Sequence, residues 1–215
     1  MPKKLSGLEN LLPEVDYQAL MAQMPHQSHP RRKLKELQNK GLLIRLKKGF
    51  YVLTKEMVGQ DYSEQIVSNL LYGPSYLSLE YALAFYHLIP ERVEVMTSIT
   101  TQKNKIFPTT IGKFTYEHLS QSLYPIGVRI GKTPDQRCFL IATPEKALMD
   151  IFSLRFKKTK KPTEKMIRSA LTEDLRFDLA AFIKNKDQSL LTEMKFIYKN
   201  RPWHHLLIDF LLEAK

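Results

Sequence analysis

The sequence predicts an α+β protein built from two parts, and three observations support this. The first part shows helical periodicity and then two short apolar runs around a Lys-Lys-Gly turn. The second part mixes helical segments with strand-like runs over residues 63–155, and the pattern after Lys165 is helical to the end. A chain of 215 residues has room for both parts. We therefore expect domains at residues 1–55 and 60–215.

Two helices are expected at the start of the chain. Leucines recur at helical spacing over residues 5–12, and Pro13 ends that segment because proline breaks a helix. Asp16 has the side chain of a good N-cap, and it precedes a second helical segment over residues 17–24.

A third helix is expected to begin at Ser28 as N-cap, with Pro30 in its first turn. Gly41 stands just past its end, where glycine is favoured. At about 100° per residue, Leu34 and Leu37 fall on the side of Pro30 and should face the core. The opposite side of this helix carries Ser28, Arg32, Lys35 and Asn39, with Arg31 and Lys40 flanking it.

The runs LLIRL and FYVL flank Lys47, Lys48 and Gly49 and are typical of a β-hairpin. From Pro30 to Lys48 there are eight Lys or Arg and one acid. A basic helix, a glycine stop and a basic hairpin follow one another in winged helix-turn-helix domains. In these domains the helix enters the major groove and the wing contacts phosphates. The sequence therefore predicts an N-terminal winged helix-turn-helix followed by a mixed α/β C-terminal domain with a helical tail.

The residue types suggest how such a domain would contact duplex DNA. Arg31 and Arg32 can reach guanine O6 and N7, and Asn39 can pair with an adenine edge. Lysine and arginine elsewhere on the helix and wing suit phosphate contacts. Alternatively, a winged helix serves protein interaction, and a basic helix face is often only a solvated surface. The expected DNA-binding residues are Ser28, Arg31, Arg32, Lys35, Asn39, Arg45, Lys47 and Lys48.

Charge and cysteine content fit this interpretation. The formal net charge is +11 and the sequence pI is about 9.6, which favours nucleic acid over an anionic membrane as partner. Cys138 is the only cysteine, which excludes an internal disulfide, and its apolar context predicts a buried, inert thiol. With neither a signal-peptide core nor an apolar run of membrane-spanning length, we expect a cytoplasmic protein.

The second part begins after a connector at residues 54–62. Two helices are expected first, at residues 63–72 and 78–88. Thr143, Pro144 and Glu145 have the residue types of a helix start, with a cap, a proline and an acid in order. Lysine and arginine gather over residues 155–165, a loop of undetermined role. Strands are expected at residues 93–100, 112–119, 126–131 and 137–142.

The sequence shows no catalytic constellation. It has no GxSxG elbow, P-loop, GxGxxG fingerprint or HExxH helix, so we expect no enzyme, no cofactor and no metal site. Asp135 and Glu145 faintly resemble a nuclease carboxylate pattern, although Glu145 also suits the first turn of a helix. His204 and His205, beside Trp203, are expected to pack or cap the last helix rather than to bind a metal.

Three phrases carry a family resemblance. Residues 76–100 read YLSLEYALAFYHLIPERVEVMTSIT, residues 111–119 read IGKFTYEHL, and residues 142–155 read ATPEKALMDIFSLR. These phrases, together with the hairpin sequence KGLLIRLKKGFYVL, resemble the AbiEi-type antitoxins of bacterial abortive-infection (type IV) toxin–antitoxin systems. The resemblance covers roughly residues 1–155. The longer, proline-rich segment PHQSHPRRK departs from the family pattern and puts contacts by Ser28 and His29 in question.

The resemblance implies a transcriptional repressor that binds the operator DNA of its own operon. It also implies that the second domain counters a nucleotidyltransferase-like toxin, an effect that in type IV systems can be indirect and without a stable complex. Two alternatives remain: a stand-alone regulator whose second domain dimerises or senses an effector, and a nucleic-acid enzyme that uses the winged helix for targeting. The sequence does not predict the oligomeric state.

Overall fold

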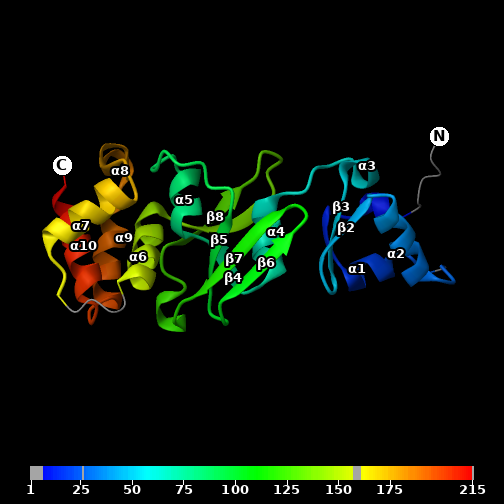
Figure 1. Cartoon of the computed structure of the whole chain (residues 1–215), viewed down its shortest axis with the longest axis horizontal. Helices are drawn as coiled ribbons and strands as arrows, with labels where there is room; N and C mark the ends of the chain where they lie inside the picture. The colour runs from blue at the N-terminus through cyan, green and yellow to red at the C-terminus, as the bar shows by residue number, and fades with distance from the viewer. Residues whose placement is uncertain (1–6, 26, 157–160, 215) are drawn as a thin grey trace.

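The computed structural model describes residues 7–25, 27–156 and 161–214, and it is an elongated mixed α+β protein. The larger of its two sheets has six strands. Figure 1 shows a small N-terminal unit at one end, this sheet in the middle and a bundle of helices at the other end. The expected α+β class with a helical C-terminal tail is confirmed at this level. No helix within the described ranges is both long and apolar enough to cross a membrane.

The N-terminal unit, residues 7–58, combines short helices with a three-stranded antiparallel sheet of order β1-β3-β2. β1 was not expected. Of the first expected helix, the described residues form only a 3₁₀ turn, and the connector contains a further short helix. The elements are η1 (Leu8–Asn10), β1 (Glu14–Asp16), α1 (Tyr17–Ala22), α2 (Pro30–Asn39), β2 (Leu43–Lys47), β3 (Phe50–Leu53) and α3 (Lys55–Val58).

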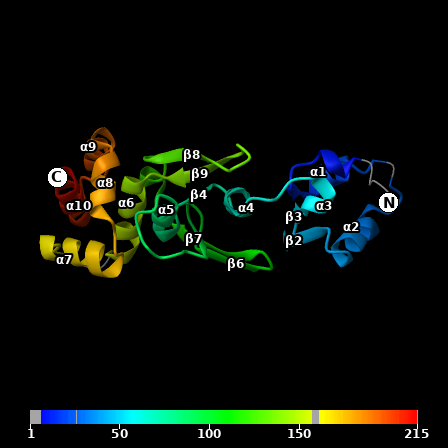
Figure 2. The same cartoon turned by 90° about the horizontal axis from the view of Figure 1, so that it is seen from above.

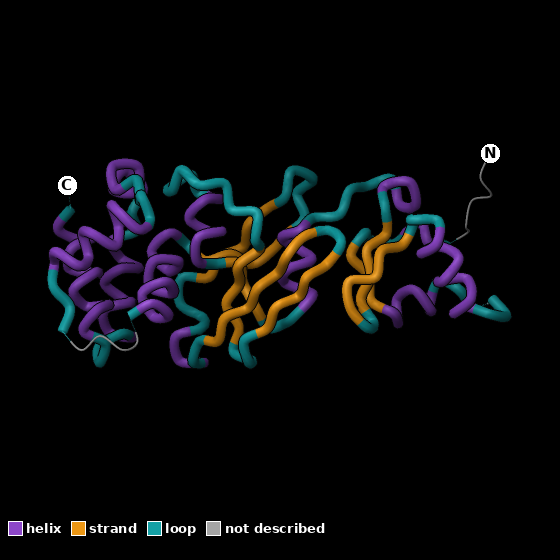
Figure 3. Tube along the Cα trace, viewed as in Figure 1, coloured by secondary structure: helices purple, strands orange, loops and turns teal. Residues whose placement is uncertain are grey.

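The two faces of this small sheet pack against different parts of the molecule. Tyr51 and Leu53 pack with the helices of the N-terminal unit in one hydrophobic cluster. Phe50 and Val52, which point to the other face because strand side chains alternate, belong to the cluster of the central sheet. Figures 1 and 3 show the same arrangement, with β2 and β3 between α2 and the central sheet.

The central sheet has the strand order β6-β7-β5-β4-β9-β8 and mixes parallel with antiparallel pairs. β5 runs parallel to β7, and β4 runs parallel to β9. The four predicted strands correspond to β5, β7, β8 and β9, while β4 and β6 were missed. The strands are β4 (Ser75–Leu77), β5 (Met96–Thr100), β6 (Lys105–Thr109), β7 (Gly112–His118), β8 (Val128–Lys132) and β9 (Cys138–Ala142).

Helices join the sheet to both ends of the molecule. Helix α4 (Glu64–Leu71) lies on the side of the N-terminal unit, whereas α5 (Leu79–Phe85) and α6 (Pro144–Arg155) lie towards the C-terminal helices (Figure 2). Thr143 caps α6 as expected, because its hydroxyl accepts the Lys146 N–H at 3.2 Å. The tail contains α7 (Glu164–Ser169), a π turn (Ala170–Asp174), α8 (Leu179–Asn185), α9 (Gln188–Ile197) and α10 (Pro202–Glu213).

A buried carboxylate ties the N-terminal unit to the central sheet. The Glu14 side chain in β1 is 2% exposed, and it accepts the Ser63 N–H at 2.6 Å and the Arg137 guanidinium at 2.5 Å. Arg137, in the turn between β8 and β9, also donates to Asp135 and to the Asp61 carbonyl. Both oxygens of Glu14 are therefore bound across the boundary between the two parts.

Candidate nucleic-acid interface

Helix α2 has one buried face and one exposed basic face. Leu34 and Leu37 are 5% and 1% exposed and pack in the cluster of the N-terminal unit, as their spacing predicts. The expected polar side is solvent-exposed along the whole helix. Its exposed members are Arg31, Arg32, Lys35, Asn39 and Lys40.

The end of α2 forms as expected, whereas its start differs. Gly41 adopts a φ of 69°, and the Leu42 N–H reaches back to the Leu37 carbonyl at 3.0 Å, which closes the helix. At the start, His29 is the N-cap and its side chain makes no capping bond, so the prediction of Ser28 as N-cap was wrong. Pro30 occupies the first turn, as its fixed φ favours.

The N-terminal turn of α2 borders an open hollow of about 510 Å³. Ser28 is exposed at this hollow, outside the helix that it was expected to cap. The basic side chains beside it come from the first turn of the helix. The lining residues are Tyr17, Ser28, His29, Pro30, Arg31 and Arg32.

The exposed face of α2 keeps a positive charge despite its one acid. Glu36 lies 3.6 Å from Arg32 and 3.7 Å from Lys33, in loose pairs on the surface. Such exposed pairs contribute little stability and open readily when a stronger anion approaches. Arg31 and Lys35 form no ion pair with any residue that the structure describes. The face therefore offers guanidinium and ammonium groups to a polyanion.

The basic side chains of the β2–β3 hairpin fall into two groups, those exposed to solvent and one that contacts the central part of the molecule. Arg45 and Lys48 are exposed, and Gly49 turns the chain with a φ of 84°. The Lys47 ammonium instead donates to the carbonyl of Leu71, the last residue of α4. A cation is favourable at the C-terminus of a helix, and partial burial lowers the pKa of Lys47. The structure therefore places Lys47, expected on phosphate, against the central part of the molecule.

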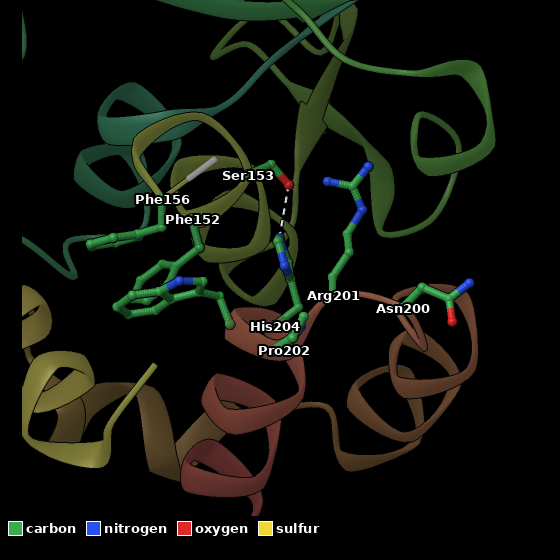
Figure 4. A pocket seen from close by; sticks show the side chains of 8 residues that line it. Phe152, Ser153, Phe156, Asn200, Arg201, Pro202 and His204 are labelled. Atoms are coloured by element: carbon green, nitrogen blue, oxygen red, sulfur yellow. Dashed lines mark hydrogen bonds between the residues drawn. The ribbon is translucent and has the colours of Figure 1, made fainter. Parts of the chain in front are cut away.

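A second polar site joins α6 to α10. A cavity of about 180 Å³ lies beside the imidazole of His204, which is hydrogen-bonded to the Ser153 hydroxyl at 2.8 Å. Figure 4 shows the side chains that line it. Aromatic rings form one wall, and the rings of Phe156 and Trp203 stack at 4.2 Å. A serine next to a histidine raises the question of nucleophilic catalysis. The two residues are 51 positions apart, so no local motif in the sequence links them.

The hydrogen bonds of His204 argue against a nucleophile–base pair. Its Nε2 atom is also 3.1 Å from the Met149 carbonyl, which is only an acceptor, so Nε2 carries the ring proton. A protonated Nε2 donates to Ser153 and has no lone pair with which to activate the hydroxyl. Burial lowers the pKa of His204 to about 4, which keeps the ring neutral at pH 7. His204 thus packs the last helix, as predicted.

A fully buried ion pair on α6 lies between the central sheet and the C-terminal helices. Lys146 and Asp150, one turn apart on α6, approach to 2.6 Å and are both 0% exposed. Lys146 also donates to the Leu123 carbonyl at 2.7 Å, while Tyr76 and Ser78 donate to Asp150 at 3.0 and 2.7 Å. Burial lowers the pKa of the lysine and raises the pKa of the aspartate, and their attraction opposes both shifts. Because every charged atom has partners, this network connects elements rather than offering a reactive group.

The two carboxylates that the nuclease alternative would use, Asp135 and Glu145, are each bound to different groups of the protein. Asp135 binds Arg137 at 2.8 Å and the Gln60 amide at 2.6 Å, and hydrogen bonds hold the pKa of this exposed carboxyl well below its usual range. Glu145 is buried and accepts the Asp187 N–H at 2.9 Å. Over the described ranges, no group of three or more His, Cys, Asp or Glu is arranged to hold a metal ion.

Comparison with known proteins gives a fold relationship. No protein-family model and no curated protein matches this sequence. The crystal structure of the RV2827C protein from Mycobacterium tuberculosis is similar, with a TM-score of 0.58 and 12% sequence identity. The match covers 97% of this chain and 74% of that chain. At this identity the likeness concerns the fold.

Proposed function

We propose that the N-terminal unit is a winged helix-turn-helix and that the protein is a transcriptional repressor binding the operator DNA of its own operon. The observation that carries this proposal is the exposed basic face of α2, opposite the buried Leu34 and Leu37. A helix anchored by one face and basic on the other has the form of a recognition helix.

The order of elements supports the same assignment. β1, two helices and then the hairpin of β2 and β3 follow one another, and the sheet order is β1-β3-β2. Helix α2 precedes the hairpin directly, as a recognition helix precedes a wing. In both views of the molecule α2 lies on the outer side of the unit, away from the central sheet (Figures 1 and 2). A duplex can therefore approach this helix from outside.

The proposed contacts follow from exposure. Arg31, Arg32 and Asn39 are suited to base edges in the major groove. Lys35 on the helix, with Arg45 and Lys48 on the wing, are suited to phosphates, and Ser28 stands at the helix start. Lys47 is omitted because its ammonium binds the Leu71 carbonyl.

The antitoxin role rests on the resemblance of residues 1–155 to AbiEi-type antitoxins. On that basis we propose that the remainder of the molecule counters a nucleotidyltransferase-like toxin and has no catalytic role of its own. The hydrogen bonds of Ser153 and His204 agree with this, because they leave the serine unactivated. A repressor works where the chromosome is, so we place the protein in the cytoplasm.

A mobility-shift titration tests the repressor proposal. The purified protein is titrated against its own upstream DNA at two salt concentrations, with unrelated DNA as competitor. A discrete complex that survives competition is the expected result. Binding that salt abolishes equally for both DNAs would refute a sequence-specific repressor, because phosphate contacts alone give affinity without specificity.

A further inference from the structure

The outer edge of β8 has unused backbone hydrogen-bonding groups. The backbone N–H of Thr133 donates to the Arg137 carbonyl, and the backbone N–H of Thr143 donates to the Gly127 carbonyl. These two bonds fix the register between β8 and β9 at both ends. Because antiparallel bonding alternates, Arg129 and Gly131 bond to β9, while Ile130 and Lys132 direct their N–H and C=O groups outward. No described residue pairs with these outward groups, and β8 is the last strand of the sheet.

An exposed apolar surface adjoins this edge. Ile130 is 67% exposed, and its cross-strand neighbour Leu140 on β9 is 41% exposed. Leu70 of α4, 52% exposed, extends the surface, and Asn69 of the same helix binds both the N–H and the carbonyl of Leu140. A groove of about 310 Å³ between α4 and β9 is lined by Leu70, Leu140 and the exposed Cys138. The cysteine was predicted to be buried, but its side chain lies on the open face of this edge hairpin.

The charges along β8 indicate the chemistry of an incoming strand. Arg129 and Lys132 are exposed, and β8 contains no acid. Arg129 pairs with Asp187 at 2.8 Å yet remains 60% exposed, and Lys132 has no ion-pair partner within the described ranges. In a chain of net charge +11, a second copy would bring further positive charge to this edge. An acidic strand would instead find complementary charge.

The opposite edge of the sheet is protected and serves as a contrast. β6 contains Pro108, which has no N–H to donate, and prolines inside edge strands face their nitrogen to solvent. By the two-residue period, the N–H of Ile106 points the same way as the Pro108 nitrogen. Ile106 is 59% exposed, which makes it a close match to Ile130.

We propose that β8 is a docking edge for an extended, acidic segment of a partner protein, which adds an antiparallel strand to the central sheet. Opposite Lys132 and Arg129 the segment carries acids, and opposite Ile130 and Val128 it carries apolar side chains. From its N-terminal end, the partner segment therefore carries an acid, any residue, an apolar residue, an acid and an apolar residue. Backbone hydrogen bonds provide affinity, and these side chains provide specificity for the partner. The proposal stands independently of DNA binding.

Backbone amide exchange, followed by NMR on the full chain, tests this surface. The probe is a blocked peptide containing Glu-Thr-Ile-Glu-Val, and its control replaces both glutamates with lysine. At a peptide concentration ten times the dissociation constant, the Ile130 and Lys132 amides should exchange roughly tenfold more slowly. The lysine peptide should give no protection.

Two matched variants locate the contact. Ile130→Pro removes an outward N–H without removing a bond to β9, and it should abolish binding of the acidic peptide. Ile106→Pro makes the same change on β6 and should leave binding intact. Absence of protection in the wild-type chain, equal protection by both peptides, or binding that survives Ile130→Pro would overturn the proposal. So would dimerisation through β8, seen by sedimentation and removed by Ile130→Pro, since a second copy would then occupy the edge.

Discussion

At the scale of single residues, the two lysines of the β2–β3 hairpin should behave differently. Lys48→Ala should reduce the steepness with which log affinity for DNA falls with log salt concentration by about one unit. Each phosphate contact contributes slightly less than one unit to this slope. Lys47→Ala should leave that slope unchanged, because its ammonium already binds the Leu71 carbonyl. Mobility-shift titrations at several salt concentrations measure both slopes. Equal slope changes in the two variants would contradict the assignment of Lys47.

His204 should make stability depend on pH. The pKa is lowered to about 4 in the fold from an ordinary value of 6.5, so the unfolded chain binds the proton more readily. The stabilisation is fully present above pH 6.5 and is lost as the pH falls towards 4. Between pH 7 and pH 5 this residue should cost about 2 kcal/mol of unfolding free energy.

Urea unfolding at the two pH values measures this loss. His204→Gln, which keeps an amide near the Nε2 position but does not titrate, provides the control. The variant should be less stable at pH 7 and should lose about 2 kcal/mol less than the wild type at pH 5. An identical pH dependence in the two proteins would exclude His204 as the titrating group.

Individual residues were predictable where local pattern decides their position. The exposure of Arg31 and Lys35 follows from the buried Leu34 and Leu37 on the same helix, since one period fixes both faces. The fate of Lys47 depends on Leu71, which lies 24 positions away. Ser28 was misassigned because Pro30 moves the start of α2 by one residue, to His29.

At the scale of elements, two glycines should differ in their tolerance of a side chain. Both have positive φ, 69° at Gly41 and 71° at Gly127. A Cβ at Gly41 would meet nothing within 4 Å, whereas at Gly127 it would lie 2.7 Å from both Lys146 Cβ and Met194 Cε. Gly41→Ala should therefore cost about 1 kcal/mol of backbone strain, and Gly127→Ala clearly more, because α6 or α9 must shift.

Thermal unfolding of the two alanine variants compares these costs directly. Circular dichroism at 25 °C should show the wild-type fold for Gly41→Ala. A larger loss of stability at Gly41 than at Gly127 would contradict the close packing of the Gly127 loop between α6 and α9.

The elements that were predicted correctly had a clear hydrophobic periodicity or a recognisable capping residue. Strands β7, β8 and β9 and helix α6 were located to within a few residues. β1 and β4 have three residues each, too few to show alternation, and β6 contains a proline, which argues against a strand away from an edge. Strand order was not predictable, because pairing of β4 with β9 joins segments more than sixty residues apart.

At the scale of the whole molecule, Arg137 should govern how firmly the N-terminal unit is held. Arg137→Met would leave the Glu14 carboxylate buried without its cation, which should cost about 3 kcal/mol. Adding Glu14→Gln should recover part of this loss, because a neutral amide is less costly to bury. Chemical unfolding of the single and double variants measures the coupling, and simple additivity would disprove a direct interaction.

The contacts that hold the N-terminal unit also keep helix α2 and the edge of β8 apart, so that both surfaces can be occupied at the same time. Glu14, Arg137 and Lys47 hold the N-terminal unit so that α2 lies at one end of the long axis while β8 lies in the middle (Figures 1 and 2). A duplex seated on α2 leaves the β8 edge uncovered. Under the proposed repressor function, a partner docked on β8 would be held close to the operator DNA. Two ligands on one scaffold reach an effective concentration on the order of millimolar.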